Sequence, residues 1–119
     1  MKVIVNVTSD FKKEAKPLLK KYASLKNDLL NLEKELLLNP TQGISLGNNC
    51  YKIRLKIASK GKGKSGGARV ISYLETELVV SADINDVSTI VNLITIYDKS
   101  QTETITDKEL KQLIVNLNR

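Results

Sequence analysis

The cations between residues 36 and 74 are the part of the sequence with the clearest chemistry. This segment carries seven cationic side chains and no carboxylate, whereas the rest of the chain holds twelve cations against thirteen carboxylates. The whole net charge of +6 therefore originates in this segment. Such concentrated positive charge favours an anionic partner, either a nucleic acid or an acidic protein. The seven residues are Lys52, Arg54, Lys56, Lys60, Lys62, Lys64 and Arg69.

The first three of these cations follow a strict alternation with apolar residues. Lys52, Arg54 and Lys56 alternate with Ile53, Leu55 and Ile57, which predicts a strand that is cationic on one face and apolar on the other. The alternative to an anion-binding role is that these cations form the solvated face of an edge strand, where lysine discourages aggregation. Three cations in line repel one another, which edge protection does not require, so we favour an anion-binding face.

A glycine-rich loop follows this strand. Gly61, Gly63 and Gly66 fit the spacing G-x-G-x-x-G, and residues 63–65 resemble the end of a P-loop. Both motifs need a helix that begins inside them, because its N-terminus must meet the phosphate. The residues that follow, ARVISYL, are alternating and rich in β-branched side chains, which predicts a strand instead. The loop is therefore interpreted as a hairpin turn whose lysines reach outward.

Several classes of chemistry are excluded by what the sequence lacks. Histidine is absent, so acid–base chemistry near neutral pH would need a perturbed lysine, tyrosine or carboxylate. Cys50 is the single cysteine, which excludes an internal disulfide and a Cys/His metal cluster. The sequence therefore predicts no metal and no cofactor. Neither a membrane-spanning run nor a secretory signal is present, so we expect a cytoplasmic protein without a membrane partner.

The local patterns predict seven elements in one domain that covers residues 1–119. Ser9 or Asp10 is expected to cap the first helix, and Pro17 to kink or break it. Ser24 is expected to cap the second, and residues 106–109 form a capping box before the last. The predicted strands span residues 3–7, 51–58, 68–74 with an extension to 80, and 89–97; the predicted helices occupy residues 9–23, 24–38 and 106–117.

The resulting fold class is α+β, with the order β-α-α-β-β-β-α. Residues 41–49 are expected to be a loop, and Asp83, Asn85 and Asp86 to mark a turn. The most continuously apolar stretch, residues 89–97, is expected to be the central strand. The second helix is expected to bury a stripe of leucines that includes Leu37. Together these patterns predict an antiparallel sheet with a helical hairpin packed on one face and a C-terminal helix.

In this arrangement the chain resembles the RelE/ParE family of bacterial toxins over nearly its whole length. The most specific stretches are CYKIRLK at residues 50–56, GKSGGARVI at 63–71 and ITIYDKS at 94–100. The resemblance implies a toxin that a cognate antitoxin neutralises. RelE-like members cleave mRNA in the ribosomal A site. ParE-like members target DNA gyrase and lack the cations on their strands.

The resemblance also implies site residues. Lys52 and Arg54 correspond to the pair of basic strand positions in RelE-like toxins, and Arg69 to the arginine after the hairpin. Lys99 stands where that type has another arginine. The hairpin is longer and richer in lysine than in the shortest RelE-like members. Their tyrosine lies after the last strand, where this chain has residues such as Ile105, so Tyr97 is the expected substitute.

These side chains suit a metal-independent endoribonuclease. The RNA 2′-OH would attack the adjacent phosphate, with Lys52 as base because repulsion from nearby cations favours its neutral form. Arg54 and Arg69 would hold the phosphate oxygens, and Lys99 or Tyr97 would protonate or shield the leaving oxygen. The alternatives are a non-catalytic gyrase inhibitor and a basic RNA- or ribosome-binding module. The residues expected to grip RNA backbone, including ribosomal RNA, are Lys56, Lys60, Lys62 and Lys64.

Overall fold

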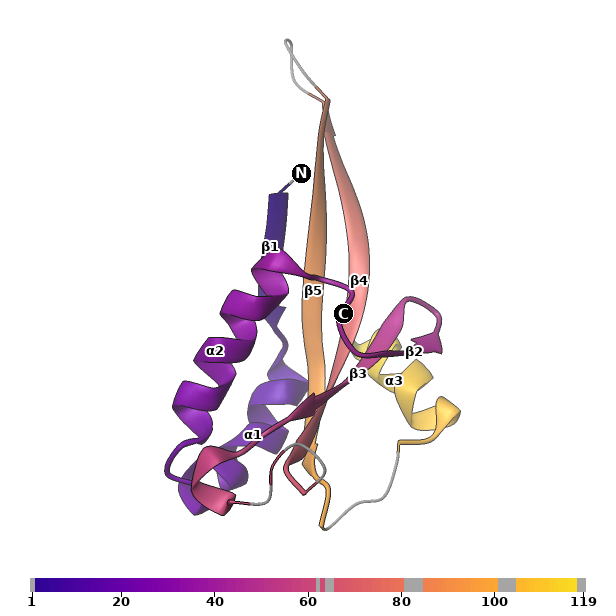
Figure 1. Cartoon of the computed structure of the whole chain (residues 1–119). Coiled ribbons are helices and arrows are strands. Elements are labelled where there is room, and N and C mark those ends of the chain that lie inside the picture. Colours follow the sequence, from indigo (N-terminus) through magenta and orange to yellow (C-terminus); the bar gives the residue numbers. More distant parts are fainter. Residues whose placement is uncertain (1, 62, 64–65, 81–84, 101–104, 118–119) are drawn as a thin grey trace.

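The computed structural model describes residues 2–61, 63, 66–80, 85–100 and 105–117. Three α-helices and five strands are found in this part of the chain (Figure 1). In chain order they are β1 (Lys2–Val7), α1 (Ser9–Lys21), α2 (Leu25–Leu38), β2 (Ile44–Gly47), β3 (Cys50–Leu55), the 3₁₀ turn η1 (Ala58–Lys60), β4 (Ala68–Val80), β5 (Asn85–Asp98) and α3 (Asp107–Leu117).

The strands form one sheet in the order β1-β5-β4-β3-β2. The predicted α+β class, with a helical hairpin on the sheet and a C-terminal helix, is confirmed. One pair departs from the predicted antiparallel arrangement, because β1 pairs with β5 in parallel. Parallel strands need a long connection that crosses the sheet. The helical hairpin supplies the crossing, because it links β1 at one edge of the sheet to β2 at the other edge. The predicted central strand β5 is interior, but β4 occupies the middle of the sheet.

The predicted loop at residues 41–49 contains a strand. Residues Ile44–Gly47 form β2 and pair with β3 in an antiparallel hairpin. Asn48 and Asn49 both have positive φ, 53° and 62°, which is the conformation that a tight two-residue hairpin turn requires. Asparagine tolerates this conformation better than most residues. The Asn-Asn pair was thus the signal for the hairpin that the sequence interpretation missed.

The first helix differs from its prediction in its N-cap. Its N-cap is Thr8, whose Oγ1 accepts a hydrogen bond from the Phe11 backbone N–H at 3.2 Å, and neither Ser9 nor Asp10 takes that role. The helix also runs through Pro17 without a break. Phe11 and Leu18 are buried on either side of the proline, so packing against the core supports both halves of the helix.

Other element boundaries also shift. The strand β3 ends at Leu55, three residues before its predicted end, and the turn η1 follows. The strand β4 extends to Val80 as predicted, whereas Asn85 and Asp86 lie in β5 and not in a turn. Asp83 lies outside the described residues. In the described part of the glycine-rich loop no helix begins, and β4 starts at residue 68, which agrees with the rejection of a dinucleotide or P-loop motif.

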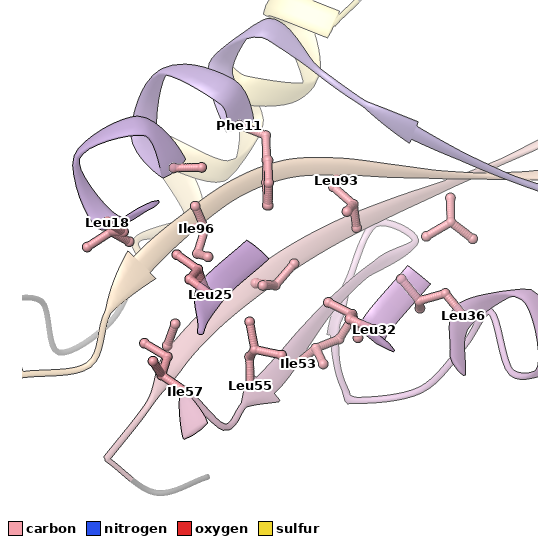
Figure 2. Packing of buried hydrophobic residues seen from close by; sticks show 14 residues of the cluster. Phe11, Leu18, Leu25, Leu32, Leu36, Ile53, Leu55, Ile57, Leu93 and Ile96 are labelled. Carbon is pink, nitrogen blue, oxygen red and sulfur yellow. The ribbon is translucent and has the colours of Figure 1, made fainter. Parts of the chain in front are cut away.

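The main core lies between the helical hairpin and one face of the sheet, as Figure 2 shows. Leu25, Leu32 and Leu36 of α2 are buried there, whereas Leu37, which was expected in the same stripe, is 46% exposed. The core side chains that Figure 2 labels are Phe11, Leu18, Leu25, Leu32, Leu36, Ile53, Leu55, Ile57, Leu93 and Ile96.

A second, smaller cluster lies on the other face of the sheet. Cys50, Ile71 and Ile94 are buried there against Leu110 of α3. The predicted capping box begins this helix, because Thr106 Oγ1 accepts from the Glu109 backbone N–H at 3.2 Å and donates to the Glu109 carboxylate at 2.9 Å. Among the described helices, none combines the length and the apolar character that crossing a membrane requires. The cationic face of the sheet is thus partly covered by α3.

Candidate functional site

Three predicted site residues form one row across the sheet. Arg54 on β3 lies directly opposite Arg69 on β4, and Arg69 lies directly opposite Tyr97 on β5. Directly paired residues point to the same face and have Cβ atoms about 5 Å apart. Lys52 is two residues from Arg54 on β3 and therefore shares this face. The register thus brings Lys52, Arg54, Arg69 and Tyr97 together, as predicted.

The middle residue of the row is buried. Arg69 is only 4% exposed, and its Nη1 donates a hydrogen bond to the carbonyl of Ala68 at 3.2 Å. Burial lowers the pKa of Arg69, and the neighbouring Arg54 lowers it further. Arg69 is therefore not part of an open cationic surface. Arg69 lies on β4, the middle strand of the sheet, where neighbouring side chains cover it. A guanidinium that solvent does not reach acts on nearby groups mainly through the electric field of its charge.

Tyr97 lies beneath the start of α3. Its ring and Ile105 both pack against the smaller cluster, and its buried hydroxyl has no hydrogen-bond partner in the part of the chain that the structure describes. Burial raises the pKa of Tyr97; Arg69 lowers it and Glu109 raises it. A cavity of about 390 Å³ beside the ring is lined by Glu109, Asp10 and Glu14, among others. The acidic side chains disfavour a phosphate in that cavity.

The accessible cations lie on β3, the strand next to the edge strand β2, and just beyond the end of β3. Arg54 and Lys56 are exposed and Lys52 is half-buried. A cavity of about 260 Å³ that Arg54 and Lys56 line also contains Asp28 and Glu35 of α2. The segment without carboxylates in the sequence therefore has carboxylates near it in space. The cationic surface is narrower than the charge pattern suggested, and Lys52, Arg54 and Lys56 are its accessible part.

Lys60 does not belong to this surface. Its Nζ lies 2.8 Å from Oδ1 of Asp98, and the exposed fractions of the two side chains are 11% and 0%. Lys60 also lies over the ring of Tyr22 of the helical hairpin, with 5.4 Å between Nζ and the ring centre. The predicted contact between Lys60 and RNA is therefore corrected, because a buried ion pair already engages this ammonium group. The sequence interpretation had assigned no role to Asp98.

The remaining predicted residues lie near or beyond the limits of the described structure. Lys99 follows β5; its side chain is half-buried, and its backbone N–H donates to the carbonyl of Gly67 at 3.0 Å. Lys62 and Lys64 lie outside the described residues. Cys50 is fully buried, and burial raises the pKa of its thiol to about 11. A buried, protonated thiol packs as a small apolar side chain.

No family model matches this chain, and no solved structure matches it. Within the described ranges, no group of three or more His, Cys, Asp or Glu side chains is placed to hold a metal ion. Any assignment of the site must therefore rest on the geometry of the cations and of Tyr97.

Proposed function

We propose that this protein is a RelE-like toxin of a toxin–antitoxin pair, which acts in the cytoplasm as an endoribonuclease on mRNA at the ribosome. The cross-strand row Arg54–Arg69–Tyr97 is the observation that carries the proposal, with Lys52 two residues along on the same face. It supplies one face with a base, cations and a hydroxyl donor. RNA cleavage by attack of a 2′-OH on the adjacent phosphate requires these groups.

The exposed cations provide the first contact with RNA. Arg54 is accessible and offers a planar fork for two phosphate oxygens. Lys56 is equally accessible and would contact the neighbouring backbone. Each phosphate contact releases counterions, so binding should weaken steeply with salt.

The buried groups, Arg69 and the Tyr97 hydroxyl, would influence the reaction from beneath the exposed cations. Arg69 lies one strand from Arg54 and places a second positive charge in a poorly hydrated environment, where its field is strongest. Tyr97 carries a hydroxyl that is protonated at neutral pH, and burial raises its pKa further above the ordinary value. In this proposal Lys52 removes the 2′-OH proton, and Tyr97 or Lys99 protonates or shields the leaving 5′ oxygen.

A second candidate function is non-catalytic binding, either of gyrase in the manner of ParE-like toxins or of RNA. The burial of Arg69 and of the Tyr97 hydroxyl favours it. Both groups would have to become accessible before they could touch a substrate phosphate. A binder needs only the exposed cations.

The experiment is inducible expression of the chain with and without the neighbouring open reading frame, followed by mapping of transcript ends and of DNA breaks. The proposal expects cuts within translated mRNA that are lost in Lys52→Ala and reduced in Arg54→Ala. Lys34→Ala is the matched control, since Lys34 is an exposed lysine of α2 outside the site. Intact mRNA with DNA breaks would identify a gyrase inhibitor. Intact mRNA and intact DNA, with binding to ribosomes that Arg54→Ala weakens, would identify a binding module.

A further inference from the structure

A surface groove of about 580 Å³ runs between α1 and α2. Phe11 and Ala15 of α1 and Leu93 of β5 line it, and each is no more than 4% exposed. Leu29 and Leu30 of α2 line it as well. The floor of the groove is therefore apolar. None of the residues that line it belongs to the Arg54–Arg69–Tyr97 row.

Three apolar side chains of the groove remain in contact with water. Leu30 is 48% exposed, Leu19 is 42% exposed and Val7 is 37% exposed. Exposed apolar residues are ordinary when they are scattered, but here they line one hollow. Covering them would be favourable by about 25 cal/mol for each Å² of apolar surface removed from water. The groove thus has the character of a docking surface.

The rim of the groove is cationic. Lys12, Lys16 and Lys20 line it from α1 and Lys26 from α2, whereas Glu33 is the one carboxylate among its lining residues within the described structure. The three lysines of α1 are spaced four residues apart, so they form a row along the helix with about 6 Å between neighbours. A helical partner with carboxylates at the same four-residue spacing would match this row. The rim thus selects an anionic occupant.

We propose that this groove binds an amphipathic α-helix of a partner protein, with an apolar stripe that enters the groove and acidic residues that meet the α1 lysines. This is the helix-in-groove mode of recognition. A second copy of this chain fits poorly, because the two lysine rims would face each other. Nucleic acid fits poorly too, because the groove's aromatic residue, Phe11, is only 3% exposed and offers no stacking surface. The inference does not depend on the proposed ribonuclease function.

The test uses fluorescein-labelled helical peptides of 18 residues with leucines at i, i+3, i+4 and i+7. One series carries glutamates beside the leucine stripe, in several registers, and a matched series carries lysines there. Fluorescence anisotropy with the full chain should show saturable binding of a glutamate peptide and at least tenfold weaker binding of its lysine counterpart. Dodecanoate is tested in parallel as a fatty-acid probe.

Two pairs of variants locate the binding. Leu30→Glu should weaken binding of the glutamate peptide about tenfold or more, whereas Leu38→Glu should change it less than twofold, because Leu38 is 90% exposed on the same helix outside the groove. Lys16→Glu should likewise weaken binding more than Lys13→Glu, which lies on α1 but lines another cavity. Thermal unfolding confirms that each variant is folded.

Three results would overturn the proposal. The first is that glutamate peptides in every register bind no better than lysine peptides. The second is that Leu30→Glu and Leu38→Glu affect binding equally. The third is that dodecanoate alone binds and does so in a way that depends on Leu30, which would make the groove a fatty-acid site.

Discussion

Lys60 Nζ lies 2.8 Å from Asp98 Oδ1, and this ion pair joins the turn after β3 to the end of β5. Asp98 also accepts hydrogen bonds from the Tyr22 hydroxyl at 2.5 Å and from the Ser100 hydroxyl at 2.7 Å. Its side chain is fully buried, so these partners replace the water that the carboxylate loses. The network joins three parts of the chain that are distant in sequence.

Removing one partner of this pair should destabilise the fold. Lys60→Ala leaves the Asp98 carboxylate buried without its cation, which typically costs about 3 kcal/mol in the free energy of unfolding. Lys56→Ala removes an exposed lysine from the same stretch and should change stability by less than about 0.5 kcal/mol. Urea denaturation of both variants measures the difference. Equal stability of the two would show that the Lys60–Asp98 pair contributes nothing measurable.

The same pair should make stability depend on acid pH. Burial alone would raise the pKa of Asp98, but hydrogen bonds from Lys60, Tyr22 and Ser100 outweigh it and hold the pKa well below its ordinary value of 3.8. The unfolded chain therefore binds a proton at a higher pH than the folded chain, and the contribution of Asp98 is lost as the pH falls below about 3.8. Denaturation between pH 3 and 7 should show the wild type losing its advantage over the double variant K60M/D98N at the acid end. A constant difference across this range would contradict the prediction.

The two arginines that face each other across β3 and β4 should repel. Arg54→Gln removes one charge from the directly opposed pair and should stabilise the fold by about 0.5 kcal/mol at low salt. Added salt screens the repulsion, so the gain should shrink towards zero near 1 M NaCl. Lys56→Gln, which removes a cation beyond the end of β3, is the control. An Arg54→Gln variant that is no more stable than wild type at low salt would argue against direct repulsion.

Gly67 is required by close packing against β3. A Cβ atom at this position would lie 2.0 Å from the carbonyl oxygen of Leu55, so Gly67→Ala must displace backbone and should cost about 3 kcal/mol. Gly61 has a φ of +73° with open space around it, so Gly61→Ala should cost only about 1 kcal/mol for its left-handed backbone. Thermal unfolding of the two variants distinguishes the clash from the backbone preference. The prediction fails if Gly61→Ala is the more damaging change.

The sequence by itself determined the types of the seven elements that it predicted, although not β2, and the shared face of the cations. Alternation along residues 51–57 is a property of extended backbone, so Lys52 and Arg54 had to point away from Ile53 and Leu55. The capping box at Thr106 is equally local, since its hydrogen bonds join residues three apart. Such short-range features follow from the geometry of the chain alone.

Only the tertiary structure decided which charges are accessible. Lys60 and Asp98 are 38 residues apart, and no local pattern records that burial brings them together. The same holds for α3, which covers Tyr97, and for Asp28 and Glu35, which approach Arg54 from another element. The sequence defines where charges occur along the chain. Burial and pairing depend on contacts between distant segments, and these form only when the whole domain folds.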